Sequence, residues 1–137
     1  MQKRDGWTVV LGIAAFGNLV NGVWMLADPY NWYWNLPAAV PDTGPLNEHF
    51  VRDLGATFSV MAAALAFAAV RPVTRVPLVG LVMLFYVLHA GIHVFDTLRG
   101  LLPASHWGID FPGVYLPALL MLAIVYALSR ARTAAPA

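Results

Sequence analysis

Histidine, arginine and carboxylate side chains recur at helical spacing in two short motifs of this sequence. The first motif, E-H-F-V-R-D, runs from Glu48 to Asp53. Residues three and four apart on a helix are neighbours, so His49, Arg52 and Asp53 share one face. Imidazole and carboxylate groups arranged in this way can hold a metal ion or transfer a proton.

The second motif, Y-V-L-H-A-G-I-H-V-F-D, runs from Tyr86 to Asp96. Its polar residues are spaced by three, four and three, so Tyr86, His89, His93 and Asp96 lie on one helical stripe. His89 and His93 can present two imidazoles to one ion. Asp96 can bind the same ion or orient the imidazoles from behind.

The two motifs are expected to meet, because the helices that carry them are antiparallel and joined by a short turn. The start of one helix is then level with the end of the other, as in bundles that build carboxylate–histidine metal centres. The predicted metal ligands are His49, Asp53, His89, His93 and Asp96. Residues predicted to line the pocket or balance charge are Arg52, Glu48, Tyr86, Asn18 and Asn21.

The donor set of nitrogen and oxygen suits zinc, copper, iron or manganese. A bis-histidine haem fits less well, because Asp53 and Asp96 lie beside the histidines. Metal-free acid–base chemistry is another alternative, in which Arg52 holds an anionic group. Ionisable groups inside a membrane span are costly and mark function by default. A structural clamp at the membrane surface is the non-functional alternative.

The composition indicates which elements must position these residues. The chain is 60% hydrophobic and only 11% charged, whereas soluble domains are about 45–50% apolar and about 25% charged. An integral membrane protein is therefore expected, with the lipid bilayer as its first partner. The net charge of +1 excludes nucleic acid as an expected partner, and the absence of cysteine excludes disulfides and thiolate metal sites.

Four apolar stretches reach the length of about 20 residues that a spanning helix needs. They cover about residues 7–27, 48–70, 76–95 and 112–129, and predict an all-α four-helix bundle that forms a single domain over residues 1–137. Pro72 and Pro77 flank the turn between the second and third spans. Pro117 is expected to kink the fourth span, because it lacks a backbone donor.

The charged residues are divided unevenly between the two ends of this bundle. One end receives Lys3, Arg4, Arg71, Arg75, Arg130 and Arg132. The positive-inside rule then places both termini in the cytoplasm, with the chain in the bacterial inner membrane. The other end receives every histidine and all acidic residues but one: Asp28, Asp42, Glu48, Asp53, Asp96 and Asp110.

The long outer loop, about residues 28–47, contains Tyr30, Trp32, Tyr33 and Trp34. Aromatic rings of this kind anchor proteins at the level of the lipid headgroups. A lid over an outward-facing pocket is the alternative interpretation. The third loop carries His106, Trp107 and Asp110 and is a second candidate for such a lid.

The H-F-V-R-D-L-G-A motif that opens the second span, together with H-A-G-I-H-V-F-D at the end of the third, resembles small bacterial membrane proteins of the DoxX-like kind. The resemblance covers the second and third spans best. It implies four helices and an inner-membrane location. Because some DoxX-like proteins are small subunits of respiratory or redox enzymes, it also implies a redox connection. It carries no catalytic residue over to this chain.

Three functional hypotheses follow, and whether the chain is an enzyme stays open. In the first, an outward-facing His/Asp site binds a divalent transition metal for redox chemistry or metal handling on a lipid-soluble substrate. In the second, the chain is a non-catalytic accessory subunit of a larger membrane complex or a homo-oligomer. In the third, it binds a lipid or a quinone-like molecule beneath the aromatic loop.

Overall fold

The computed structural model describes residues 5–133, and side chains up to residue 131, as a bundle of helices. Four helical segments are long and apolar enough to cross a membrane. They are α1 (Gly6–Ala27), α3 (Glu48–Val70), η2 (Pro72–Thr74) with α4 (Arg75–Leu98), and η3 (Phe111–Tyr115) with α6 (Leu116–Thr133). The described residues form no strand, so the predicted all-helical fold with four span-length helices is confirmed.

The outer loop contains two short helices, α2 (Pro29–Asn35) and η1 (Val40–Thr43). Asp28 caps α2, because its Oδ1 accepts a hydrogen bond from the backbone N–H of Asn31 at 3.0 Å. Pro29 occupies the first turn, where its missing N–H costs nothing. Another short helix, α5 (His106–Ile109), lies in the third loop.

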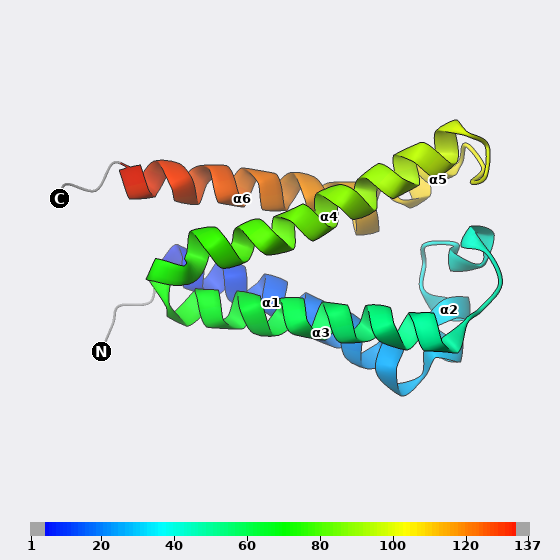
Figure 1. Cartoon of the computed structure of the whole chain (residues 1–137), viewed down its shortest axis with the longest axis horizontal. Helices are drawn as coiled ribbons and strands as arrows, with labels where there is room; N and C mark the ends of the chain where they lie inside the picture. Colours follow the sequence, from blue (N-terminus) through cyan, green and yellow to red (C-terminus); the bar gives the residue numbers. More distant parts are fainter. Residues whose placement is uncertain (1–4, 134–137) are drawn as a thin grey trace.

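The four long helices are arranged as two pairs, α1 with α3 and α4 with α6 (Figure 1). The pairs are joined through η2 at one end of the molecule, where α1 also begins and α6 ends. At the opposite end, which we call the loop end, the pairs diverge and carry α2, η1 and α5 (Figure 1).

Glycines allow α1 and α3 to approach closely. A methyl group added at Gly22 would lie 2.8 Å from the carbonyl oxygen of Gly55, and one added at Gly55 would lie 2.8 Å from Cβ of Met25. Both distances are shorter than a carbon atom tolerates. The two helices therefore meet backbone to backbone at this crossing, as small residues permit in membrane bundles.

A buried arginine, Arg75, links two helices at the end of the bundle opposite the loop end. Nη1 and Nη2 of Arg75 donate to the carboxylate of Asp5 at 2.6 and 2.9 Å, and Nη2 also donates to the carbonyl of Ala69 at 3.2 Å. These contacts join the start of α1 to the α3–α4 turn. Hydrogen bonding from Arg75 lowers the pKa of Asp5 to about 2.

The outer surface of the long helices is apolar. Ile13, Phe16, Val60 and Leu81 are each at least 66% exposed, although a soluble bundle would carry polar groups there. This is the distribution expected when lipid is the solvent for the outer faces.

The last span begins with a π-helical turn, η3. The backbone N–H groups of Val114 and Tyr115 both donate to the carbonyl of Asp110, at 2.8 and 3.3 Å. This wider turn directly precedes Pro117, which cannot donate a backbone hydrogen bond. The π-helical turn therefore holds Asp110 at the start of the last span.

Candidate functional site

Four histidine and aspartate side chains form a connected network at the loop end. Nδ1 of His93 lies 2.7 Å from Oδ2 of Asp110. Nδ1 of His106 lies 3.1 Å from both carboxylate oxygens of Asp110, and its Nε2 lies 3.2 Å from Oδ2 of Asp42. We call Asp42, His93, His106 and Asp110 the His–Asp cluster.

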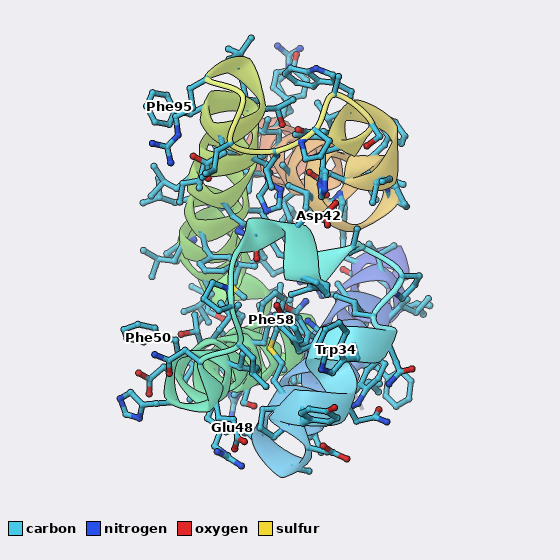
Figure 2. All side chains as sticks on the ribbon, turned by 90° about the vertical axis from the view of Figure 1, so that its right-hand side faces the viewer. Trp34, Asp42, Glu48, Phe50, Phe58 and Phe95 are labelled. Atoms are coloured by element: carbon cyan, nitrogen blue, oxygen red, sulfur yellow. The ribbon has the colours of Figure 1, made fainter. Side chains whose placement is uncertain are left out.

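Three separate segments supply this cluster. His93 projects from the last turns of α4. His106 opens α5 and Asp110 follows its last residue, so these two side chains are four residues apart on one short helix. Asp42 comes from η1 and lies between the two helix pairs, on the side of α5 and η3 (Figure 2). The cluster therefore links the outer loop of the first helix pair to the second helix pair.

Burial makes the charges of this cluster interdependent. The side chain of Asp110 is 1% exposed and that of His106 is 0% exposed, whereas Asp42 is partly exposed to solvent. A buried carboxylate is costly unless it is paired and hydrogen-bonded, and Asp110 has an imidazole on each of two sides. His106 has a carboxylate at each ring nitrogen, and only an imidazolium has two N–H groups with which to satisfy both.

The pKa of His106 follows from these contacts. Burial alone disfavours the charged imidazolium and lowers the pKa. The hydrogen bonds to Asp42 and Asp110, with the charges of both carboxylates, outweigh burial and raise the pKa of His106 above its ordinary value. An imidazolium at His106 would offset one of the two carboxylate charges of the cluster.

A cavity of about 280 Å³ adjoins the His–Asp cluster. Met25 of α1, Leu54 and Phe58 of α3, and Val114 of η3 form its apolar walls. Residues of the outer loop complete the enclosure: Trp32, Leu36, Ala38, Val40 and Thr43. The loop thus lines one side of a cavity between the two helix pairs. Phe58 lies in the interior of the end-on view (Figure 2).

His89 stands in the cavity wall one helical turn from His93. Its ring stacks on Phe85 with centroids 5.8 Å apart and planes inclined by 11°, and it meets the ring of His93 edge-on at 4.7 Å. Among the described residues, no side chain or backbone group makes a hydrogen bond to the His89 imidazole. Its ring is held in place by packing, and the residue is partly exposed.

The structure does not bring the motif at the start of α3 to this site. Nε2 of His49 lies 3.3 Å from Oδ2 of Asp53, and these side chains are 80% and 65% exposed. Arg52 pairs with Glu48 at 2.9 Å on the same outer surface. Glu48 and Phe50 lie at the outer edge of the loop end (Figure 2). The helix pairs diverge here, so the two motifs that were expected to face each other point in different directions.

The polar stripe on α4, in contrast, does reach the cavity. His89, His93 and Asp96 all line the cavity, and Asn21 of α1 lines it from the other side. Asp96 is turned partly away, because its Oδ1 accepts a hydrogen bond from Nε of Arg99 at 2.9 Å. Helical spacing therefore identified the α4 side of the site.

The remaining predicted pocket residues have structural partners. The hydroxyl of Tyr86 donates to Oδ1 of Asn18 at 3.0 Å, and both residues are buried between the helix pairs. Asn21 accepts a hydrogen bond from Nε1 of Trp32 at 2.9 Å, which ties α2 to α1. These contacts brace the cavity and its lid.

Sequence reasoning treated His106 and Asp110 only as residues of a second lid and gave Asp42 no role in the site. One signal was present, because His106 and Asp110 are four residues apart and would share a face if the loop were helical. A helix of only four residues has no hydrophobic periodicity from which to predict it. Nothing in the sequence around Asp42 connects it to residues 64 positions further on.

Three donors of the cluster lie close enough together to be candidate ligands of one metal ion. His93, His106 and Asp110 each offer one ligand atom, and these atoms lie within 4.8 Å of one another. Zinc ligands at about 2.0–2.2 Å from the ion lie at most about 4.4 Å apart. Small side-chain adjustments would therefore suffice.

No protein-family model, curated protein or solved structure matches the chain.

Proposed function

We propose that the chain is an inner-membrane protein whose His–Asp cluster binds a divalent transition metal. His93, His106 and Asp110 are the proposed ligands, in place of the larger set expected from spacing alone. The metal would serve redox chemistry or metal handling on a lipid-soluble substrate in the adjoining cavity. The observation that carries the proposal is the convergence of three donor groups from two separate elements on one buried point.

Two features of the cluster support this assignment. Metal-bound histidines usually donate their second ring N–H to a carboxylate, and His106 has Asp42 at 3.2 Å in that position. Asp42 and Asp110 together carry two negative charges, which a divalent ion would neutralise. Such an ion would take the place of a proton on Nδ1 of His106. The donor set of nitrogen and oxygen suits zinc, copper or iron.

The proposed orientation follows the basic residues. Arg71, Arg75 and Arg130 lie at the end opposite the His–Asp cluster, which the positive-inside rule assigns to the cytoplasm. Lys3 and Arg4 lie outside the described residues, as does the side chain of Arg132, and the rule counts them from sequence alone. The cluster then faces the outer side of the membrane. We also propose that the chain belongs to the DoxX-like membrane proteins.

A metal-free acid–base site is the second candidate. The short contact of 2.7 Å between Nδ1 of His93 and Asp110 favours it, because a carboxylate that orients an imidazole makes that imidazole a competent general base. In this candidate Asp110 holds an N–H at Nδ1 of His93 and leaves Nε2 free to act.

Elemental analysis of protein purified in mild detergent tests the two candidates. We expect close to one equivalent of metal per chain in the wild type, and a loss of most of it in the double variant His93→Ala/His106→Ala. His49→Ala is the matched control, because His49 is also a loop-end histidine but lies on the exposed surface. It should retain the metal.

The result that rejects metal binding is equally definite. A wild type that holds only a small fraction of an equivalent, at a level that the double variant does not change, would reject the metal site. An absorption spectrum of the same sample tests for haem, which would produce a strong Soret band.

A further inference from the structure

We infer that the cavity beside the His–Asp cluster binds the ring-sized polar head of a lipid-soluble molecule, with His89 as its hydrogen-bonding partner. The head is a six-membered ring that carries a hydroxyl or carbonyl oxygen. This inference names the substrate class for the proposed function. It rests on the proposed function only in assuming that the cavity and the metal act together. Binding of the head itself requires no metal.

His89 is the residue that points to a ligand. It lines the cavity, its ring is fixed against Phe85, and no described residue makes a hydrogen bond to it. Polar groups enclosed in proteins nearly always have a partner in the protein, in water or in a ligand. Since a neutral imidazole has one donor and one acceptor, a hydroxyl or carbonyl oxygen in the cavity would complete its hydrogen bonding.

The residues that line the cavity indicate the shape of the rest of the ligand. Met25, Leu54 and Val114 offer apolar contacts, and Phe58 and Trp32 add aromatic rings to the lining. An aromatic wall of this kind favours a flat ring. Small-molecule sites share this design, with a mostly apolar lining and a few polar groups that fix orientation.

The size of the cavity limits what it encloses. Its volume of about 280 Å³ is just below the range of about 300–1,000 Å³ for pockets that enclose drug-sized ligands. A single substituted ring fits this space, whereas a long hydrocarbon tail must lie outside it. The helix exteriors are apolar along their length. A tail that leaves the cavity between the two helix pairs would therefore enter lipid.

Thermal unfolding with a matched pair of probes tests this inference. Chelator-treated protein in mild detergent is titrated with 4-pentylphenol and, separately, with pentylbenzene, which lacks only the hydroxyl. A ligand that binds the folded state raises the melting temperature with its concentration. We expect saturable stabilisation by the phenol and little by the hydrocarbon.

Variants locate the hydrogen bond. His89→Phe keeps a flat ring against Phe85 but removes both nitrogen atoms, and it should bind the phenol about tenfold more weakly, which corresponds to one lost hydrogen bond. His49→Phe is the matched control and should bind as the wild type does. Should His89→Phe fail to fold, His89→Gln supplies the test, because it retains a donor and an acceptor and should keep the preference for phenol over hydrocarbon.

A second measurement places the probe. Trp32 lines the cavity, so 4-bromophenol should quench part of the tryptophan fluorescence saturably, and Trp32→Phe should abolish that part. Equal stabilisation by phenol and hydrocarbon would overturn the inference, as would a phenol preference that survives in His89→Phe. A cavity that holds only water would show no saturable binding of either probe.

The metal content of the same preparations separates this inference from the proposed function. Protein that selects the phenol but retains no metal before chelation would reject the metal site alone. Protein that holds its metal but does not distinguish the two probes would reject the ring-binding cavity alone.

Discussion

Nδ1 of His93 lies 2.7 Å from Oδ2 of Asp110, and this contact fastens the end of α4 to the π-helical turn that begins the last span. The same carboxylate contacts His106 with its other oxygen. Asp110 is thus the shared centre of the His–Asp cluster, and the cluster depends on its charge.

Asp110→Asn therefore tests the site with almost no change in shape. An amide carries no charge and binds metal poorly, so we expect affinity for Zn²⁺ to fall at least about tenfold, as it does when groups around metal sites are altered. Competition with a chromophoric chelator measures the affinity. Asp53→Asn, on the exposed surface, should match the wild type. Equal Zn²⁺ affinity in Asp110→Asn and the wild type would remove Asp110 from the ligand set.

The contact between Asp42 and His106 predicts that the lid is tethered. Removing the carboxylate in Asp42→Ala should leave η1 without its anchor to α5. The hydrogen-bonded amides at positions 42 and 44 should then exchange with deuterium faster, about tenfold or more if one charged hydrogen bond is lost. Amides within α3 should not change. Exchange in η1 at the wild-type rate would show that packing alone, for example by Trp32 and Leu36, holds the lid.

The buried hydrogen bond between Tyr86 and Asn18 predicts a moderate loss of stability in Tyr86→Phe. Deleting the hydroxyl leaves Oδ1 of Asn18 without its donor at 3.0 Å. Hydrogen bonds between membrane helices contribute about 0.6 kcal/mol on average and at most about 1.7 kcal/mol. We expect a loss within that range in denaturant titrations. Tyr126→Phe, which alters an exposed tyrosine of α6, should be neutral.

The backbone contact between α1 and α3 predicts that Gly22→Ala is destabilising. Its Cβ would meet the carbonyl of Gly55 at 2.8 Å, and backbone cannot move aside as a flexible side chain can. Overpacking of this kind costs about 1–3 kcal/mol. Gly17→Ala is the matched control, because nothing lies within 4 Å of a methyl group there. A Gly22→Ala protein as stable as Gly17→Ala would contradict the close crossing.

The Asp5–Arg75 pair predicts a loss of stability that depends on pH. Asp5→Asn should lower stability by about 1–2 kcal/mol at neutral pH, at the low end for a charged hydrogen bond because Asp5 is half-exposed. The pKa of Asp5 is lowered from 3.8 to about 2 in the folded protein. Its contribution is therefore complete above about pH 4 and is lost as the pH falls through 2.

Melting temperatures of the wild type and Asp5→Asn in detergent should thus differ by a constant amount between pH 5 and pH 7. The difference should shrink as the pH falls from 4 toward 2. A difference that grows on acidification would mean that Arg75 is stabilised by groups other than Asp5.

The sequence by itself determined the all-helical fold and the four helices that are long and apolar enough to span a membrane. Both depend on composition and on the length of the apolar stretches, which do not require knowledge of which helices touch. Local spacing also determined the α4 side of the site, since His89 and His93 share a face in any α-helix that contains them. The same reasoning placed His49 and Asp53 on one face correctly, but could not tell which way that face points.

Only the tertiary structure decided the partners of that α4 stripe. The pairing of α1 with α3 turns His49 and Asp53 outward, and the divergence of the two helix pairs opens the cavity at the loop end. Short helices in the loops then bring Asp110 to His93 across 17 residues and Asp42 to His106 across 64 residues. Contacts at such separations depend on how whole helices pack. The spacing of residues within one segment cannot predict this packing, because the packing depends on contacts between different segments.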